Sequence, residues 1–192
     1  MCPSPEVSPQ HAQEFSREER ITLLDLSHRS ISAAIAKLDL SLEPPSPHLA
    51  EPRGVFTTLY HRGSLRGCVG HMFPNSSVYR AVAETARAAA FEDTRFYPVT
   101  VKEASELEIS LSILSALKPI TPENVEIGVH GLLVSMAGRR GLLLPQVPVE
   151  HQWDRIHFLE QTCKKAGLPA NAWQSGAELE AFTAEVFSDR AM

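Results

Sequence analysis

Residues 65–70, LRGCVG, place a cysteine and an arginine among glycines directly after an apolar segment. Glycine is favoured where the backbone turns or approaches another group closely. An adjacent guanidinium lowers the pKa of a thiol and can hold an anion. The stretch therefore indicates either a binding or reactive site centred on Cys68 and Arg66, or an inert cysteine in a strand that turns at its glycines.

The flanking residues place Cys68 in the middle of a strand. Residues 55–60 are rich in β-branched and aromatic side chains, and residues 61–64 (HRGS) are typical of a hairpin turn, so residues 65–72 are expected to return as the partner strand. Other strands are also predicted mainly as hairpins, with helices interspersed singly. This order favours an α+β fold with antiparallel sheets covered on one face.

Capping signals and periodicity predict the remaining elements. Residues 16–19 (SREE) form a capping box that opens a helix, after a leader over residues 1–15 whose spaced prolines predict disorder. The buried stripe of that helix is expected to consist of Ile21, Leu24, Ile31, Ile35 and Leu38. The other predictions are helices at 78–91 and 153–166, a helical turn at 100–105, a half-buried strand at 107–115, a hairpin over 132–144 and a single closing strand at 179–187.

The hexapeptide resembles the signature of the AMME-region protein family, also known as AmmeMemoRadiSam system protein A, with Val69 where isoleucine is more usual. The resemblance implies two closely packed two-layer α/β lobes with mainly antiparallel sheets. It covers roughly residues 16–187 as one family domain, with the smaller lobe expected around residues 61–115. The segments that carry the likeness are residues 54–59 (GVFTTL), 91–98 (FEDTRFYP), 108–110, 114–115, 141–147 (GLLLPQV) and 165–168 (KAGL).

Polar residues in these segments complete a candidate site. Asp93 and Arg95 follow a predicted helix, where they either pin a loop through local hydrogen bonds or form a ligand clamp with Arg66. The resemblance favours the clamp, because the segments belong to the family pattern. The resulting set of expected ligand-binding residues is Arg66, Gly67, Gly70, Asp93, Arg95, Glu108 and Gln146.

Cys68 is the one credible nucleophile among the three cysteines. Cys163 lies on an apolar helical stripe, and Cys2 lies in the leader. His71 is three residues from Cys68 and would point to the opposite face of an unbroken strand, while His61 lies beyond the turn. The sequence therefore assigns Cys68 as a candidate catalytic residue without identifying its base.

Composition excludes several classes of protein. The 192 residues carry a net charge of −5, which argues against a general nucleic-acid binder. The cysteines show no CxxC spacing and the eight histidines no metal-ligand spacing, so we expect neither a disulfide framework nor a metal site. We assign no cofactor. No apolar run is long enough to cross a bilayer, and reduced thiols in the cytoplasm are expected.

Two classes of function remain. The first is component A of the AmmeMemoRadiSam system, acting as a small-molecule-handling enzyme component at a Cys68–Arg66 cleft. For it the resemblance implies a Memo-like protein and a radical S-adenosylmethionine protein as companions; the chain lacks the CxxxCxxC motif of the radical component itself. The second is a non-catalytic binding or adaptor module that recognises a protein, a peptide or a metabolite. A buried, unreactive Cys68 favours the second class.

Overall fold

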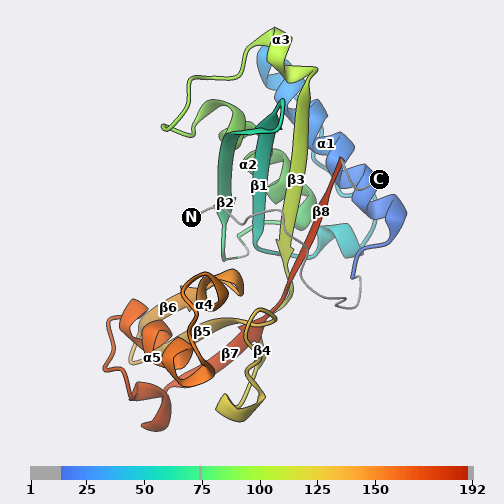
Figure 1. Ribbon diagram of the computed structural model, residues 1–192. Coiled ribbons are helices and arrows are strands. Elements are labelled where there is room, and N and C mark those ends of the chain that lie inside the picture. The colour runs from blue at the N-terminus through green and yellow to red at the C-terminus, as the bar shows by residue number, and fades with distance from the viewer. Residues whose placement is uncertain (1–13, 74, 190–192) are drawn as a thin grey trace. The chain divides into compact units, whose positions relative to one another are not determined.

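The computed structural model describes residues 14–73 and 75–189. The chain forms two compact units (Figure 1). Among the described residues, the first comprises 14–73, 75–114 and 185–189, and the second is Ser115–Ala184. Each unit contains a four-stranded sheet and its own helices, so the predicted α+β class is confirmed.

The first unit is a sheet with strand order β2-β1-β3-β8 and two long helices on one face (Figure 1). Strand β1 runs antiparallel to both of its neighbours, β2 and β3. The β1–β2 turn has Arg62 at φ 50° and Gly63 at φ 79°, the pair of positive φ values that a two-residue hairpin favours. The elements are α1 (Arg17–Ala36), η1 (His48–Ala50), β1 (Val55–His61), β2 (Ser64–His71), α2 (Val78–Phe91), α3 (Val101–Ala104), β3 (Leu107–Leu114) and β8 (Ala184–Ser188).

Helix α1 begins with the predicted capping box, in which Ser16 and Glu19 bond each other's backbone amides. Its predicted buried stripe is partly wrong, because Ile21 and Leu38 are exposed while Leu23 and Leu26 are fully buried. Leu38 falls outside the helix, which ends at Ala36. The misplacement of Leu38 arises because the expected stripe assumed a longer helix than the one that forms.

The structured chain begins earlier than predicted. Phe15 is buried, its ring stacks on His48 at 4.8 Å, and the amides of Glu14 and Phe15 both donate to the carboxylate of Glu185. The predicted disorder is therefore wrong for Glu14 and Phe15, because the buried aromatic side chain of Phe15 holds this segment in place. The rest of that leader lies outside the described residues.

Helix α2 lies close to the sheet because its face is made of small residues. A Cβ on Gly67 of β2 would lie 2.1 Å from the carbonyl oxygen of Ala89. On the same sheet face, the hydroxyls of Thr57 and Thr85 are 2.8 Å apart. Strand β3 was expected to be half-buried, but Ser110 and Ser112 on its polar side are buried as well.

The second unit is a sheet with strand order β4-β7-β5-β6 and the helix α5 packed against β5 and β6. Phe158, Leu159 and Cys163 of this helix are fully buried in the core of the unit. Its elements are β4 (Lys118–Pro119), η2 (Pro122–Asn124), β5 (Gly131–Met136), β6 (Arg139–Leu143), α4 (Gln146–Glu150), α5 (Arg155–Lys165), η3 (Ala172–Gln174) and β7 (Glu178–Phe182).

The structure corrects two boundaries. The smaller unit is Ser115–Ala184, whereas the sequence placed it around residues 61–115. Up to Leu114, those residues belong to the first unit and share a core with α1 and α2. Residues 179–187 are not one strand but parts of β7 and β8, which belong to different sheets. At the break, Thr183 donates to the Ser115 hydroxyl and Ser115 donates back to the Thr183 carbonyl. No glycine or proline interrupts residues 179–187, so the sequence predicts one strand there.

Within residues 14–73 and 75–189, no helix has both the length and the hydropathy needed to cross a bilayer.

Candidate functional site

A β-bulge sets the position of Arg66. Leu59 of β1 lies opposite Gly67 and Tyr60 lies opposite Leu65, so Arg66 is the extra residue on β2. A bulge redirects a side chain away from the regular alternation of a strand. The guanidinium of Arg66 consequently reaches the loop and short helix that precede β3.

Glu103 receives this guanidinium. Arg66 Nε donates to Glu103 Oε1 at 2.9 Å, and Arg66 Nη2 donates to Glu103 Oε2 and to the carbonyl of Pro98, both at 3.3 Å. The amide and the hydroxyl of Thr100 also donate to Oε2, each at 2.8 Å, in the capping box of α3. The Arg66 hydrogen bond, followed by those of Thr100, lowers the pKa of Glu103 to about 2. Glu103 is therefore ionised at neutral pH.

Asp93 and Arg95 close the outer edge of β2. The Cys68 amide donates to Asp93 Oδ2 at 2.8 Å, and Arg95 Nη2 donates to the Cys68 carbonyl at 3.3 Å. The two side chains also bind each other, with Arg95 Nε 2.9 Å from Oδ1 and Nη2 2.6 Å from Oδ2. The Arg95 guanidinium holds the pKa of Asp93 far below its usual value. This arrangement, called here the Asp93–Arg95 clip, supplies Cys68 with the hydrogen bonds that a neighbouring strand would make.

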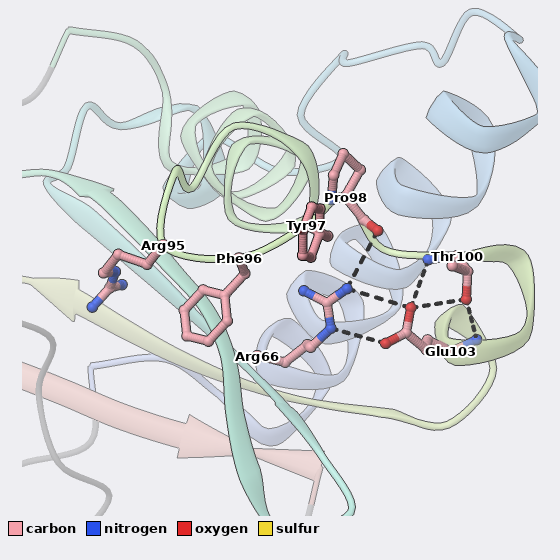
Figure 2. A pocket seen from close by; sticks show the side chains of 7 residues that line it. All are labelled: Arg66, Arg95, Phe96, Tyr97, Pro98, Thr100 and Glu103. Carbon is pink, nitrogen blue, oxygen red and sulfur yellow. Dashed lines mark hydrogen bonds and ion pairs between the residues drawn. The ribbon is translucent and has the colours of Figure 1, made fainter.

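A pocket of about 440 Å³ lies beside these two ion pairs (Figure 2). The Arg95 guanidinium lies over the Phe96 ring, 5.4 Å from its centroid, and the side chain of Tyr97 is 90 % exposed. Arg66 and Arg95 both line this pocket, whereas Cys68 and Asp93 are not among its lining residues. A ligand clamp formed by the two arginines stays a prediction. The Arg66 pocket, as we call it, is lined by Arg66, Arg95, Phe96, Tyr97, Pro98, Thr100 and Glu103.

Cys68 lies on the sheet face away from α2. It is only 8 % exposed, and the Thr58 hydroxyl donates to its sulfur at 3.4 Å. Thr58 is paired with Cys68 on one side and with Ser110 on the other, so the three residues form a row across the sheet. The sequence predicted reduced cysteines, whereas the structure has Cys68 in a disulfide bond.

Packing accounts for the two glycines beside Cys68. Gly67 lies against the backbone of α2, and a Cβ on Gly70 would lie 2.2 Å from the ring of Phe56 on the opposing strand. Neither glycine lines the Arg66 pocket. A direct ligand contact by Gly67 or Gly70 stays a prediction.

The other sequence candidates lie elsewhere. Glu108 is opposite Tyr60 on β3, and Gln146 is the first residue of α4 in the second unit. His61 bonds Glu106 at 3.1 Å, and His71 ends β2. In the part of the chain that the structure describes, no three acidic, histidine or cysteine side chains gather into a group that could hold a metal ion.

Glu103 and Thr100 line the pocket but are not among the site residues expected from the sequence. Their signal was present, because Thr100 and Glu103 have the spacing of a capping box, and a four-residue helix begins there. Phe96, Tyr97 and Pro98 lay within the segment that carried the resemblance. The contact between Arg66 and the Glu103 carboxylate could not be predicted, because the two residues lie on separate elements.

The AMMECR1 family model matches residues 24–187. The chain belongs to the AMMECR1 family. One relative, a protein of Methanosarcina acetivorans, is 43 % identical over 75 % of this chain and 75 % of its own length. Another, a protein of Methanopyrus kandleri, is 44 % identical over 77 % of this chain and 76 % of its own length. The crystal structure of the uncharacterized protein PH0010 from Pyrococcus horikoshii superposes with a TM-score of 0.67 at 36 % identity, covering 91 % of this chain and 93 % of that one. AMMECR1 membership confirms the resemblance based on residues 65–70, and none of these names states an activity.

The pairing of Glu103 predicts a pH effect on the stability of this AMMECR1 chain. Because its pKa falls from 4.5 to about 2 on folding, its contribution to stability is complete above about pH 4.5 and is lost as the pH falls towards 2. Glu103→Gln should cost about 1 kcal/mol or less at pH 7, since the pair is partly exposed. Urea unfolding of both proteins at pH 7 and pH 3 tests this; an unchanged difference between them would contradict it.

Proposed function

We propose that this chain is a non-catalytic binding module whose ligand occupies the Arg66 pocket. The observation that carries the proposal is the kind of group that lines the pocket. It offers a guanidinium donor, aromatic rings and a proline, which are groups of molecular recognition.

The two carboxylates that pair with the arginines of the pocket are unsuited to proton transfer. General acid–base catalysis works best when the pKa of the group lies near the working pH. The pKa of Glu103 is about 2 and that of Asp93 is also strongly lowered, in both cases first through a hydrogen bond from an arginine. These carboxylates are therefore fixed hydrogen-bond acceptors that orient Arg66 and Arg95.

The competing function is an enzyme component of the AmmeMemoRadiSam system with Cys68 as nucleophile. It requires a reduced Cys68 sulfur that a substrate can reach and a base beside it. The low exposure of Cys68 and its place outside the pocket lining favour the binding module. The Memo-like and radical S-adenosylmethionine companions fit both functions, as protein ligands in one and as reaction partners in the other.

A fragment screen on the full chain separates the two functions. Mixtures of small organic fragments are added to isotope-labelled protein, and we expect bound fragments to shift the resonances of Phe96, Tyr97 and Arg66 Nε. Every bound fragment should be recovered chemically unchanged by mass spectrometry. A fragment that is converted by the wild type but not by a Cys68→Ser variant would overturn the proposal, as would binding confined to residues outside the pocket.

A further inference from the structure

We propose that the Arg66 pocket takes an uncharged segment of a partner protein, with a main-chain carbonyl bonded to Arg66 and a flat apolar side chain beside Phe96 and Tyr97. This rests on the proposed function and specifies the ligand of the same site. In the sequence alone, two arginines suggest an anion site. Their pairing in the structure points to a neutral ligand.

The charged groups at the pocket balance one another. Arg66 is paired with Glu103, and Arg95 is paired with Asp93, so the four groups together carry no net charge. An anionic ligand would meet the Glu103 carboxylate along with the two guanidiniums, and the charge of Arg95 is already balanced by Asp93. It would gain little over a neutral ligand unless it displaced one of the carboxylates, and Glu103 is also held by the amide and hydroxyl of Thr100.

Arg66 also has one guanidinium nitrogen that makes no hydrogen bond to the described residues. Two nitrogens of the Arg66 guanidinium, Nε and Nη2, make its hydrogen bonds. Among the described residues no hydrogen bond reaches the third, Nη1, which Figure 2 shows on the side of the guanidinium towards Phe96. An amino group with this placement suits one acceptor oxygen, and a peptide carbonyl is such an acceptor.

The flat apolar walls of the pocket and the exposed apolar residues around it favour a protein ligand over a small metabolite. Phe96 and Pro98 provide flat apolar walls, whereas Tyr97 is 90 % exposed and extends the contact surface beyond the pocket. Val101 and Leu65, the sequence neighbours of the lining residues Thr100 and Arg66, are also exposed apolar residues. Exposed tyrosine at the rim of a pocket is typical of protein interaction sites.

The experiment uses two probes of equal size, N-acetylphenylalaninamide and N-acetylphenylalanine, which differ in a neutral amide against a carboxylate. Titrations of the full chain are followed by the resonances of Phe96, Tyr97 and Arg66 Nε. We expect the amide to bind at least as tightly as the acid, with an affinity ratio that salt does not change. Tyr97→Ala, a change at a 90 % exposed side chain that leaves folding intact, should weaken the binding of both probes.

A charge variant makes the test sharper. Glu103→Gln removes the carboxylate partner of Arg66 and leaves the pocket with a net positive charge, so the preference should invert to about fivefold in favour of the acid. Circular dichroism checks that this variant is folded.

Tighter binding of the acid to the wild type, weakened by salt, would overturn the neutral-ligand inference while leaving the pocket a binding site. If neither probe binds although fragments bind in the pocket, the neutral-ligand inference is overturned and the binding module is not. If neither the probes nor any fragment binds in the pocket, the proposal of a binding module is overturned.

Discussion

Replacing Gly67 by alanine is expected to destabilise the first unit by about 3 kcal/mol, near the upper end of the usual cost of overpacking. The added Cβ would lie 2.1 Å from the carbonyl oxygen of Ala89 and 3.1 Å from its carbonyl carbon. Both atoms belong to the backbone of α2, so a rotamer change cannot relieve the contact. The free energy of unfolding, measured by urea titration, tests the expectation.

Gly138→Ala is the matched control. This residue has φ +77°, and apart from its chain neighbours nothing lies within 4 Å of the position that its Cβ would take. The substitution should therefore cost only the left-handed backbone penalty of about 1–2 kcal/mol. If both variants lose the same free energy, the close approach of α2 to β2 is not what requires glycine at position 67.

Replacing Asp93 by alanine is expected to cost about 2–3 kcal/mol. The carboxylate is 6 % exposed and accepts the Cys68 amide, which would be left without its partner. Arg95 is 49 % exposed, so water takes over much of the lost interaction with its guanidinium. Asp93→Asn keeps one acceptor oxygen and should cost about 1 kcal/mol.

Hydrogen exchange locates this effect. The Cys68 amide should lose protection in Asp93→Ala and keep most of it in Asp93→Asn, while amides in the second unit stay unchanged. Unaltered protection of Cys68 in the alanine variant would show that the Asp93 carboxylate does not secure this part of the strand.

Local elements of the fold could be predicted because their signals lie within a few residues of each other. Helix α2 has the predicted bounds, and the turn at Arg62 and Gly63 lies where the hairpin was expected. The division into two units could not be predicted, because it depends on which strands pair. Residues 179–187 contain no glycine or proline, yet the chain passes within them from β7 in one sheet to β8 in the other.

The candidate site shows the same limit. The resemblance brought Arg66 and Arg95 together, and both line one pocket. Their carboxylate partners decide the chemistry, and Glu103 lies 37 residues beyond Arg66 in the sequence. The bond from Asp93 to the Cys68 amide depends on β2 being an outer strand, which no local pattern reveals.

The Asp93–Arg95 clip also bears on how the chain behaves in concentrated solution. Strand β2 is the outer strand of its sheet among the described residues, and an exposed strand edge is a template for pairing with a second molecule. The clip occupies the amide and the carbonyl in the middle of this edge (β2 in Figure 1), so an incoming strand finds both groups already bonded. Two charged side chains thereby protect the protein against edge-to-edge aggregation.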